Sequence, residues 1–335
     1  MIMNKQNWKQ KVLFAALLAV ILFLTSCSKK PQKIYRVGIL CGLDYISVIS
    51  DSFKDEMTVL GYVEGQNIEY DIQRTNFEPE REEQILKRFV WNKVDLIFTF
   101  PTEVSMAAKA VANGTDIPVL FCFANIEGTS LVESVPRPGG NITGVRYPGP
   151  DLAIKRFETM LELAPQVKRI WIPYQRGYPI VASQMEALRP VAKAAGFKLI
   201  EFPADNAAEI QAELDARRKL DDIGFDAILF VAEPLAVTPD AFEVMGKFAD
   251  EYKLPIGGAL IKVGGYGSIF GINVDIPKTG RQAAMLADKI LKGTPTGTIP
   301  VVSSESYFEI DYKTAKKLQV EVPKGLLGRA DKIIR

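Results

Sequence analysis

The 335-residue sequence contains no histidine. This absence excludes Ser-His-Asp and Cys-His nucleophile pairs, the most frequent general base and the commonest transition-metal ligand. Carboxylate or lysine chemistry stays open, but no spacing of acidic or basic residues indicates a catalytic site. We therefore expect a protein that is not an enzyme and that needs neither a metal nor a cofactor.

An excess of charge of either sign is also missing. Lysine and arginine total 41 and aspartate and glutamate total 40, which gives a formal net charge of +1. Such a balance provides no electrostatic basis for binding nucleic acid or an anionic membrane surface. The hydrophobic content of 47% and charged content of 24% are typical of a folded globular protein, and the length suits two domains.

Cysteine is scarce, with three residues in the chain. Cys41 and Cys122 each fall within an apolar run that reads as a buried strand. The strand order inferred below places another strand between them, which is farther than the roughly 7 Å between Cα atoms that a disulfide spans. We expect two buried thiols that behave as small apolar residues.

The third cysteine ends an N-terminal leader. Lysines at positions 5, 9 and 11 precede an apolar block over residues 12–24, and Leu-Thr-Ser-Cys closes the segment at Cys27. A basic start, a short apolar block and small residues are typical of a secretory signal peptide, and the block is too short for a membrane helix. The alternative is an ordinary signal peptide in which the cysteine is incidental. No later stretch is long and apolar enough to span a membrane.

The ending of this leader resembles the lipobox of bacterial lipoproteins. The resemblance implies that residues 1–26 are removed, that Cys27 is lipidated, and that residues 27–33 form a short polar tether. It also implies an exported protein held by its lipid at the extracytoplasmic face of a bacterial cell membrane or outer membrane. Several acyl chains, at about 0.8 kcal/mol per buried methylene, would hold it firmly.

Strand and helix signals alternate along the rest of the chain, which favours βαβ units and parallel sheets. A Pro/Gly cluster at residues 136–140 interrupts one series, and a second series follows it. The first series has strands at 35–40, 68–72, 95–99 and 119–123, with helices at 46–60, 79–89 and 102–112. The second has strands at 168–172, 198–202 and 227–231, with helices at 151–163, 180–195, 206–220 and 239–252. The tail is expected to hold strands at 269–272 and 307–310 and helices at 277–292 and 313–318. We predict two doubly wound α/β lobes that meet near Val145.

A glycine-rich stretch at residues 264–267 is the one candidate phosphate cradle. It lacks the Gly-x-Gly-x-x-Gly spacing between a strand and a helix, and no Lys-Ser/Thr pair follows it. We interpret it as a flexible crossing between the lobes.

Several motifs occur in the same order as in one protein family. Arg-Pro-Gly-Gly-Asn-Ile-Thr-Gly spans residues 137–144, and Leu-Gly-Tyr-Val-Glu-Gly-Gln-Asn spans 60–67. Thr-Gly-Arg-Gln-Ala-Ala begins at residue 279, and Ile-Asp-Tyr-Lys-Thr-Ala-Lys-Lys-Leu begins at residue 310. This set closely resembles the substrate-binding proteins of ABC transporters that are related to tryptophan/tyrosine-binding lipoproteins. The resemblance covers nearly all of the chain after the leader.

The resemblance implies the type I periplasmic binding protein fold, with two α/β lobes joined by three crossings. The crossings are expected at about Val145, Gly267 and Ser303, so residues 34–145 and 268–302 form lobe I, and residues 146–267 and 303–335 form lobe II. It further implies a monomer that captures a small molecule between its lobes and delivers it to the permease of an ABC importer. A ligand-sensing partner of a membrane signalling protein would have the same fold and is the alternative.

The chain departs from the family pattern at two positions. Residues 125–127 read Asn-Ile-Glu where many members carry Thr-Asp-Pro, and Ile276 stands where tyrosine commonly follows the aspartate that matches Asp275. The resemblance therefore favours an amino-acid-like ligand without implying an aromatic one.

Ligands of doubly wound sheets collect at the carboxyl ends of the strands, so the residues that follow strands are the site candidates. Aromatic side chains there could stack on a ligand, a threonine at a helix N-terminus could bind an anionic group, carboxylates could pair with an ammonium, and an arginine with a carboxylate. The candidates are Asp44, Tyr45, Thr102, Glu103, Phe123, Asn125, Glu127, Tyr174, Arg176, Tyr178 and Glu233.

Overall fold

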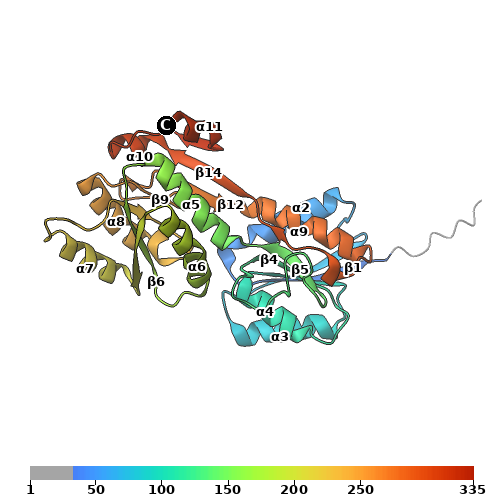
Figure 1. The fold of residues 1–335 in the computed structure, drawn as a ribbon. Coiled ribbons are helices and arrows are strands. Elements are labelled where there is room, and N and C mark those ends of the chain that lie inside the picture. Colours follow the sequence, from blue (N-terminus) through green and yellow to red (C-terminus); the bar gives the residue numbers. More distant parts are fainter. Residues whose placement is uncertain (1–32) are drawn as a thin grey trace, which may run out of the picture.

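The computed structural model describes residues 33–335, so the predicted signal peptide, Cys27 and nearly all of the tether lie outside the described residues. The chain forms two α/β lobes that lie side by side (Figure 1). The expected architecture of two lobes built on largely parallel sheets is confirmed. Within the described part of the chain, no helix has the length and apolar character required to cross a membrane.

Lobe I is built on a six-stranded sheet with the order β13-β5-β4-β3-β1-β2, in which every neighbouring pair is parallel. Its strands are β1 (Tyr35–Cys41), β2 (Ile68–Arg74), β3 (Leu96–Phe100), β4 (Val119–Ala124), β5 (Ile142–Arg146) and β13 (Val302–Ser303). Its helices are α2 (Val48–Val59), α3 (Pro79–Trp91), α4 (Thr102–Val111) and α9 (Ile276–Leu291). All five residues of β3 are buried, as expected for a parallel strand that is covered on both faces.

Helices cover both faces of this sheet. Helices α2 and α9 pack against each other on one face, where Phe53 stacks on Phe98 with 4.4 Å between ring centroids. Helices α3 and α4 cover the other face through Phe89 and Ala108. The fit of α9 on α2 is close at Gly280, because a Cβ atom there would lie 2.5 Å from the carbonyl oxygen of Ile49. The late segment that forms α9 therefore returns to complete lobe I.

Lobe II is built on a seven-stranded sheet with the order β15-β14-β12-β9-β8-β6-β7. Its strands are β6 (Arg169–Gln175), β7 (Lys198–Ala204), β8 (Ala227–Leu229), β9 (Ile256–Gly258), β12 (Phe270–Val274), β14 (Ser306–Asp311) and β15 (Lys332–Ile334). Its helices are α5 (Gly149–Leu163), α6 (Pro179–Ala194), α7 (Ala207–Arg217), α8 (Pro239–Tyr252), α10 (Tyr312–Lys317) and α11 (Lys324–Arg329). Only β14 runs antiparallel to its neighbour β12 in the described sheet. Sequence reasoning missed β9, α11 and β15.

The chain passes between the lobes three times, and one passage differs from the prediction. The passages lie between β5 and α5, between β12 and α9, and between β13 and β14. The crossing expected at Gly267 is instead near Asp275, because β12 pairs with β9 in the sheet of lobe II. Residues 268–274 therefore belong to lobe II rather than to lobe I.

The glycine-rich stretch has another structural role. It forms the turn of a small hairpin between β10 (Lys262–Val263) and β11 (Tyr266–Gly267). Gly264 and Gly265 have φ angles of +57° and +82°, a pair of positive values that a tight two-residue hairpin turn requires and that glycine adopts without strain. The interpretation of this stretch as a flexible crossing is wrong.

The sheet order also determines where the cysteines lie. Strand β3 separates β1, which carries Cys41, from β4, which carries Cys122, and both thiols are buried and free. Burial raises the pKa of each thiol above its ordinary value. Both thiols are therefore held in the protonated, apolar form that suits a core position.

Candidate functional site

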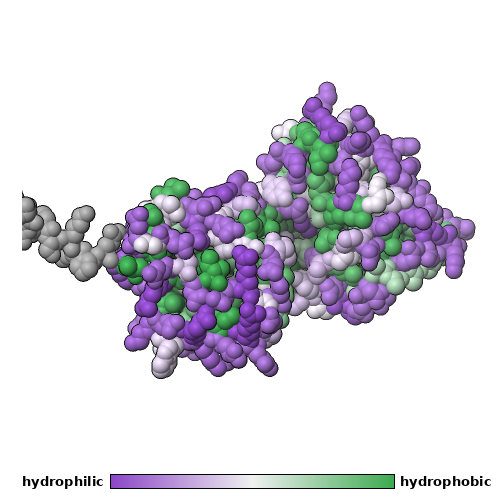
Figure 2. Space-filling model, turned by 180° about the vertical axis from the view of Figure 1, so that it is seen from behind, coloured by the Kyte–Doolittle hydropathy of each residue, from purple (hydrophilic) through white to green (hydrophobic). Residues whose placement is uncertain are grey.

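The carboxyl ends of strands from both lobes face one cleft of about 360 Å³. This size matches pockets that bind small molecules, and the narrow waist between the lobes is visible in Figure 2. The residues that line the cleft are Leu43, Tyr45, Phe77, Pro101, Thr102, Glu103, Phe123, Asn125, Tyr147, Arg156, Tyr178, Ile180, Val231, Ala232, Glu233, Pro234, Val237, Ala259 and Asn273. Most of them are apolar or aromatic, with a few polar groups among them.

Aromatic side chains reach this cleft from both lobes. Tyr45 and Phe123 lie on the lobe I side, Tyr147 lies in the passage between β5 and α5, and Tyr178 precedes α6 of lobe II. Tyr45 is 66% exposed, so its ring is free to cover a ligand at the mouth of the cleft. Burial raises the pKa of Tyr178 to about 12, which keeps its hydroxyl protonated and able to donate a hydrogen bond at neutral pH. The lobes thus offer opposing aromatic surfaces to a flat or apolar ligand.

Phe123 has an unusual backbone conformation. Its φ angle is +50°, in the left-handed region that residues with side chains rarely adopt, and the pairing of β4 with β5 shifts register between Cys122 and Ala124. The ring then packs edge-on against Tyr147, with 5.0 Å between centroids. Strained backbone of this kind is concentrated at functional sites, where it directs a side chain. Here it directs the aromatic ring of Phe123 to the cleft.

The N-terminus of α4 is tied to the end of β4 at the lobe I wall. The Thr102 hydroxyl accepts a hydrogen bond from the Asn125 backbone N–H at 2.9 Å, and the Asn125 side-chain N–H donates to the Glu127 carbonyl at 2.8 Å. The Asn125 side chain is 3% exposed, and its Oδ1 atom has no hydrogen-bond partner among residues 33–335. A buried acceptor without a donor is costly, so this oxygen is suited to meet a donor group of a ligand.

Arg156 supplies a buried positive charge from lobe II. It lies on the inner face of α5 and is 3% exposed. Its guanidinium donates to the carbonyls of Ile272 and Phe230 and to the side-chain oxygen of Asn273. Burial lowers the pKa of Arg156 from its usual value, and the guanidinium partly offsets the rise that burial causes in the pKa of Tyr147.

The two carboxylates of the cleft have different surroundings. Glu233 accepts three backbone hydrogen bonds, from Gln175, Leu235 and Ala236 at 2.9, 2.8 and 2.7 Å. Burial raises its pKa, and the three N–H donors oppose that rise. Its carboxylate therefore shapes the loop that follows β8. Glu103 is exposed in the first turn of α4, and no ion pair is formed by it within the described residues.

Seven of the predicted side chains line this cleft. They are Tyr45, Thr102, Glu103, Phe123, Asn125, Tyr178 and Glu233. The other four predicted side chains are occupied elsewhere. Asp44 bonds to Asn76, Glu127 pairs with Arg146, Tyr174 donates to Glu201, and Arg176 pairs with Asp205 and Glu209 on the outer surface. Tyr174 lies near the end of β6 and the other three follow strands, and since side chains alternate in direction along extended chain, a position at a strand end does not ensure that a side chain faces the cleft.

Sequence reasoning missed three polar residues of the cleft. Tyr147 directly follows β5, a strand end that had been treated only as a lobe boundary. Asn273 lies within β12, which was expected in the other lobe. Arg156 lies in the middle of a helix, where strand ends gave no signal. Its one signal is that it occupies the apolar face of that helix beside Leu152 and Phe157.

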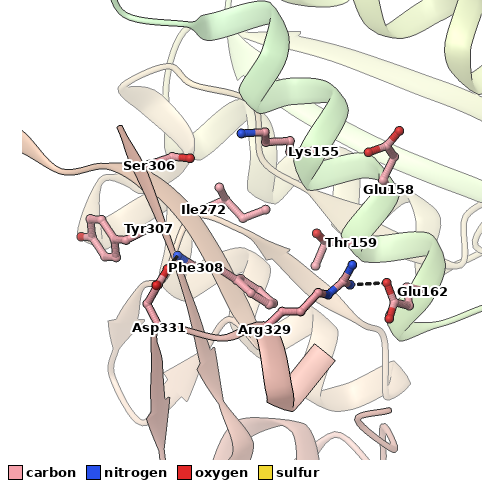
Figure 3. Close-up of a pocket in the computed structure, with 10 residues that line it drawn as sticks. All are labelled: Lys155, Glu158, Thr159, Glu162, Ile272, Ser306, Tyr307, Phe308, Arg329 and Asp331. Carbon is pink, nitrogen blue, oxygen red and sulfur yellow. Dashed lines mark hydrogen bonds and ion pairs between the residues drawn. The ribbon is translucent and has the colours of Figure 1, made fainter. Parts of the chain in front are cut away.

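A second cavity, of about 260 Å³, lies on lobe II between α5 and β14. Figure 3 shows the charged side chains around it, including the ion pair between Arg329 and Glu162. Asp331 accepts a hydrogen bond from the Phe308 backbone N–H at 2.7 Å. This cavity belongs to one lobe and two of its charged residues, Arg329 and Glu162, pair with each other, so the cleft between the lobes is the stronger candidate for a ligand site.

Two α/β lobes that flank a ligand-sized cleft form the architecture of periplasmic binding proteins. The model of the family described as ABC transporter substrate binding protein matches residues 41–334, and the chain belongs to this family. It is a solute-binding protein of an ABC transporter, and the expectation that it is not an enzyme is confirmed.

Three similar proteins indicate the range of relatives. The tyrosine-binding protein of Clostridioides difficile (strain R20291) is 25% identical in an alignment that covers 93% of this chain and 94% of the relative. A solved ABC domain in complex with L-Trp from Streptococcus pneumonia is 22% identical, with a TM-score of 0.70, and covers 90% of this chain and 100% of its own. A ligand-free, open substrate-binding protein with adhesive properties from Clostridium difficile is 22% identical, with a TM-score of 0.74, and the match covers 90% and 99% of the two chains.

Proposed function

We propose that this protein is a lipid-anchored receptor that captures an amino-acid-like solute with an aromatic or apolar side chain and delivers it to an ABC importer. The observation that carries the proposal is the cleft, which is lined by Tyr45 and Phe123 of lobe I, by Tyr147 in the passage between β5 and α5, and by Tyr178 of lobe II. A ligand between them would contact both lobes at once. The names of the relatives, one tyrosine-binding and one solved with L-Trp, support an aromatic side chain.

Capture would involve closure of the lobes around the ligand. Three short passages join the lobes, and such connections allow rigid bodies to rotate about a hinge. At the hinge, Arg146 of β5 bonds to Glu127 and Ser303 of lobe I and to Asp151 of α5. A ligand that bridges the lobes stabilises the closed arrangement by its contacts with the second wall. Small-angle scattering should therefore show a smaller radius of gyration with saturating ligand, and an unchanged radius would contradict closure.

The described N-terminal end of lobe I and the cleft lie at opposite ends of β1. The predicted tether precedes β1 (Figure 1), which begins at Tyr35, whereas the first residue that lines the cleft is Leu43, after the opposite end of that strand. Seven residues of strand extend over about 20 Å. A lipid at Cys27 would therefore hold the receptor at a membrane surface without a contact to its ligand, and we expect a monomer to suffice for this role.

Two tyrosines of lobe II provide a matched test. Tyr178 lines the cleft, and Tyr174 lies four residues earlier with its hydroxyl 3.1 Å from Glu201. A thermal-shift screen of amino acids should identify a stabilising ligand, and its affinity is then measured by calorimetry. We expect Y178A to weaken binding about tenfold or more, the loss of one aromatic contact with its buried area, and Y174A to leave it unchanged. Equal effects of the two substitutions would contradict a ligand in this cleft.

A further inference from the structure

The cleft holds a buried cation without a carboxylate partner. Arg156 is 3% exposed, and no aspartate or glutamate between residues 33 and 335 forms an ion pair with it. Its Nε and Nη2 atoms donate to the Ile272 carbonyl at 3.0 and 2.8 Å, Nη2 also to Asn273 Oδ1 at 3.2 Å, and Nη1 to the Phe230 carbonyl at 3.3 Å. All three acceptor atoms of these four bonds are neutral. Removing a charge from water costs several kcal/mol, and an opposite charge is what most effectively offsets that cost.

The guanidinium also has unused hydrogen-bonding capacity toward the cleft. It carries five N–H donors, and the four bonds just described leave one N–H of Nη1 without a partner. Arg156 is among the residues that line the cleft. A carboxylate oxygen that enters the cleft would satisfy this donor and place a negative charge beside the cation.

The two acids of the cleft do not supply that charge. Glu233 is committed to three backbone N–H groups of its own loop. Glu103 belongs to the opposite lobe and is exposed in the first turn of α4. The inner part of the cleft therefore has an excess of positive charge that only a ligand can balance.

The facing wall has the complementary deficiency. Asn125 of lobe I is also 3% exposed, and its Oδ1 atom is buried without a donor in the described part of the chain. The Asn125 Nδ2 atom donates to the Glu127 carbonyl, and Oδ1, as an amide oxygen, can only accept. Arg156 on the lobe II wall thus lacks an anionic partner, and Asn125 Oδ1 on the lobe I wall lacks a hydrogen-bond donor.

We propose that Arg156 binds the carboxylate of the ligand and that Asn125 Oδ1 accepts a hydrogen bond from a donor group, such as an ammonium, at its other polar end. The ligand class is then a carboxylate or zwitterion with its acidic end toward lobe II. This inference rests on the proposed function and refines the ligand that the same cleft takes.

The test uses three probes that share one ring. L-Tyrosine carries a carboxylate and an ammonium, 3-(4-hydroxyphenyl)propionate carries the carboxylate alone, and tyramine carries the ammonium alone. The corresponding set with an indole ring is tested in parallel, and solutes that copurify with the protein are identified by mass spectrometry. In the unmodified protein we expect the two probes of each set that carry a carboxylate to bind, and the probe that carries the ammonium alone not to bind. The des-amino acid should bind more weakly than the amino acid, because Asn125 Oδ1 then stays without a donor.

Two arginine variants separate charge recognition from a bracing role of Arg156. R156Q keeps a hydrogen-bonding side chain but removes the charge, and we expect it to weaken carboxylate binding about 10- to 100-fold, the effect of one hydrogen bond to a charged group. R176Q is the control, because Arg176 is exposed on the same lobe and pairs with Asp205 and Glu209. R156K restores the charge and should recover part of the affinity.

The outcomes distinguish this inference from the proposed function. Binding of tyramine as tight as that of L-tyrosine, or an uncharged copurified solute whose affinity R156Q leaves unchanged, would overturn the role of Arg156 while the receptor function stands. Failure of every probe and of every copurified solute to bind the folded protein would overturn the proposed function as well. If R156Q does not fold, the comparison of the three probes in the unmodified protein decides alone.

Discussion

The left-handed backbone of Phe123 predicts an inverted ranking of two substitutions. At most positions glycine is less stable than alanine by about 0.5–1 kcal/mol, because glycine loses more conformational freedom on folding. At a φ of +50°, alanine retains the left-handed penalty of about 1–2 kcal/mol, which glycine avoids. Subtracting the ordinary cost of glycine from the left-handed penalty of alanine makes F123G more stable than F123A by about 0.5–1 kcal/mol.

Phe121 of the same strand is the control. Its φ is not positive and it is fully buried, so F121G should be less stable than F121A by the usual cost of glycine, about 0.5–1 kcal/mol. Urea unfolding followed by far-ultraviolet circular dichroism measures both pairs. With an m-value of about 2 kcal/mol per M, the midpoints of F123G and F123A separate by about 0.25–0.5 M. Because both variants lack the ring, they should lose ligand affinity equally. A more stable F123A would refute the strained backbone at this position.

Three further predictions concern packing, acid stability and the anchor. G280A should destabilise the protein by about 1–3 kcal/mol, because a Cβ atom at this position would collide with α2. G328A is the control, because the space around Gly328 is open and the stability of this variant should not fall in this way. The midpoints of urea unfolding measure the two variants. Hydrogen bonds from Arg169 hold the pKa of the exposed Asp222 carboxyl at about 2, below its unfolded value. The stability that this pair contributes is therefore present above about pH 4 and is lost as the pH falls toward 2. D222N should flatten that part of the curve of unfolding free energy against pH, and an unchanged curve would contradict a stabilising role of the pair. C27S should move the protein from the membrane fraction to the soluble fraction with the same ligand affinity, and a loss of affinity would show that the anchor and the binding site are not separate.

The fold was predictable because local signals and global topology agree in this chain. Alternation of apolar runs with amphipathic helices is enough to predict parallel sheets in two lobes, and β3, buried throughout, is such a run. The crossing near Asp275 was not predictable, because β12 has the same apolar character whichever sheet it joins. Pairing with β9 is a long-range contact that no local pattern encodes.

The candidate site was predictable only where a side chain follows a strand and faces inward. That rule found Tyr45 and Tyr178, and it also selected Tyr174 and Arg176, whose side chains are engaged outside the cleft. Arg156 could not be found in this way, since it reaches the cleft from the middle of α5. An arginine on the apolar face of a helix was its one local signal, and only the assembled fold shows that no acid among residues 33–335 forms an ion pair with it.

A crystal structure of the protein with its tightest carboxylate ligand tests the central claim most directly. We expect a ligand between the lobes, with its ring beside Phe123 and Tyr178 and a carboxylate oxygen within hydrogen-bond distance of Arg156 Nη1. A ligand bound in the cavity between α5 and β14, or one in the cleft with its carboxylate directed away from Arg156, would contradict it.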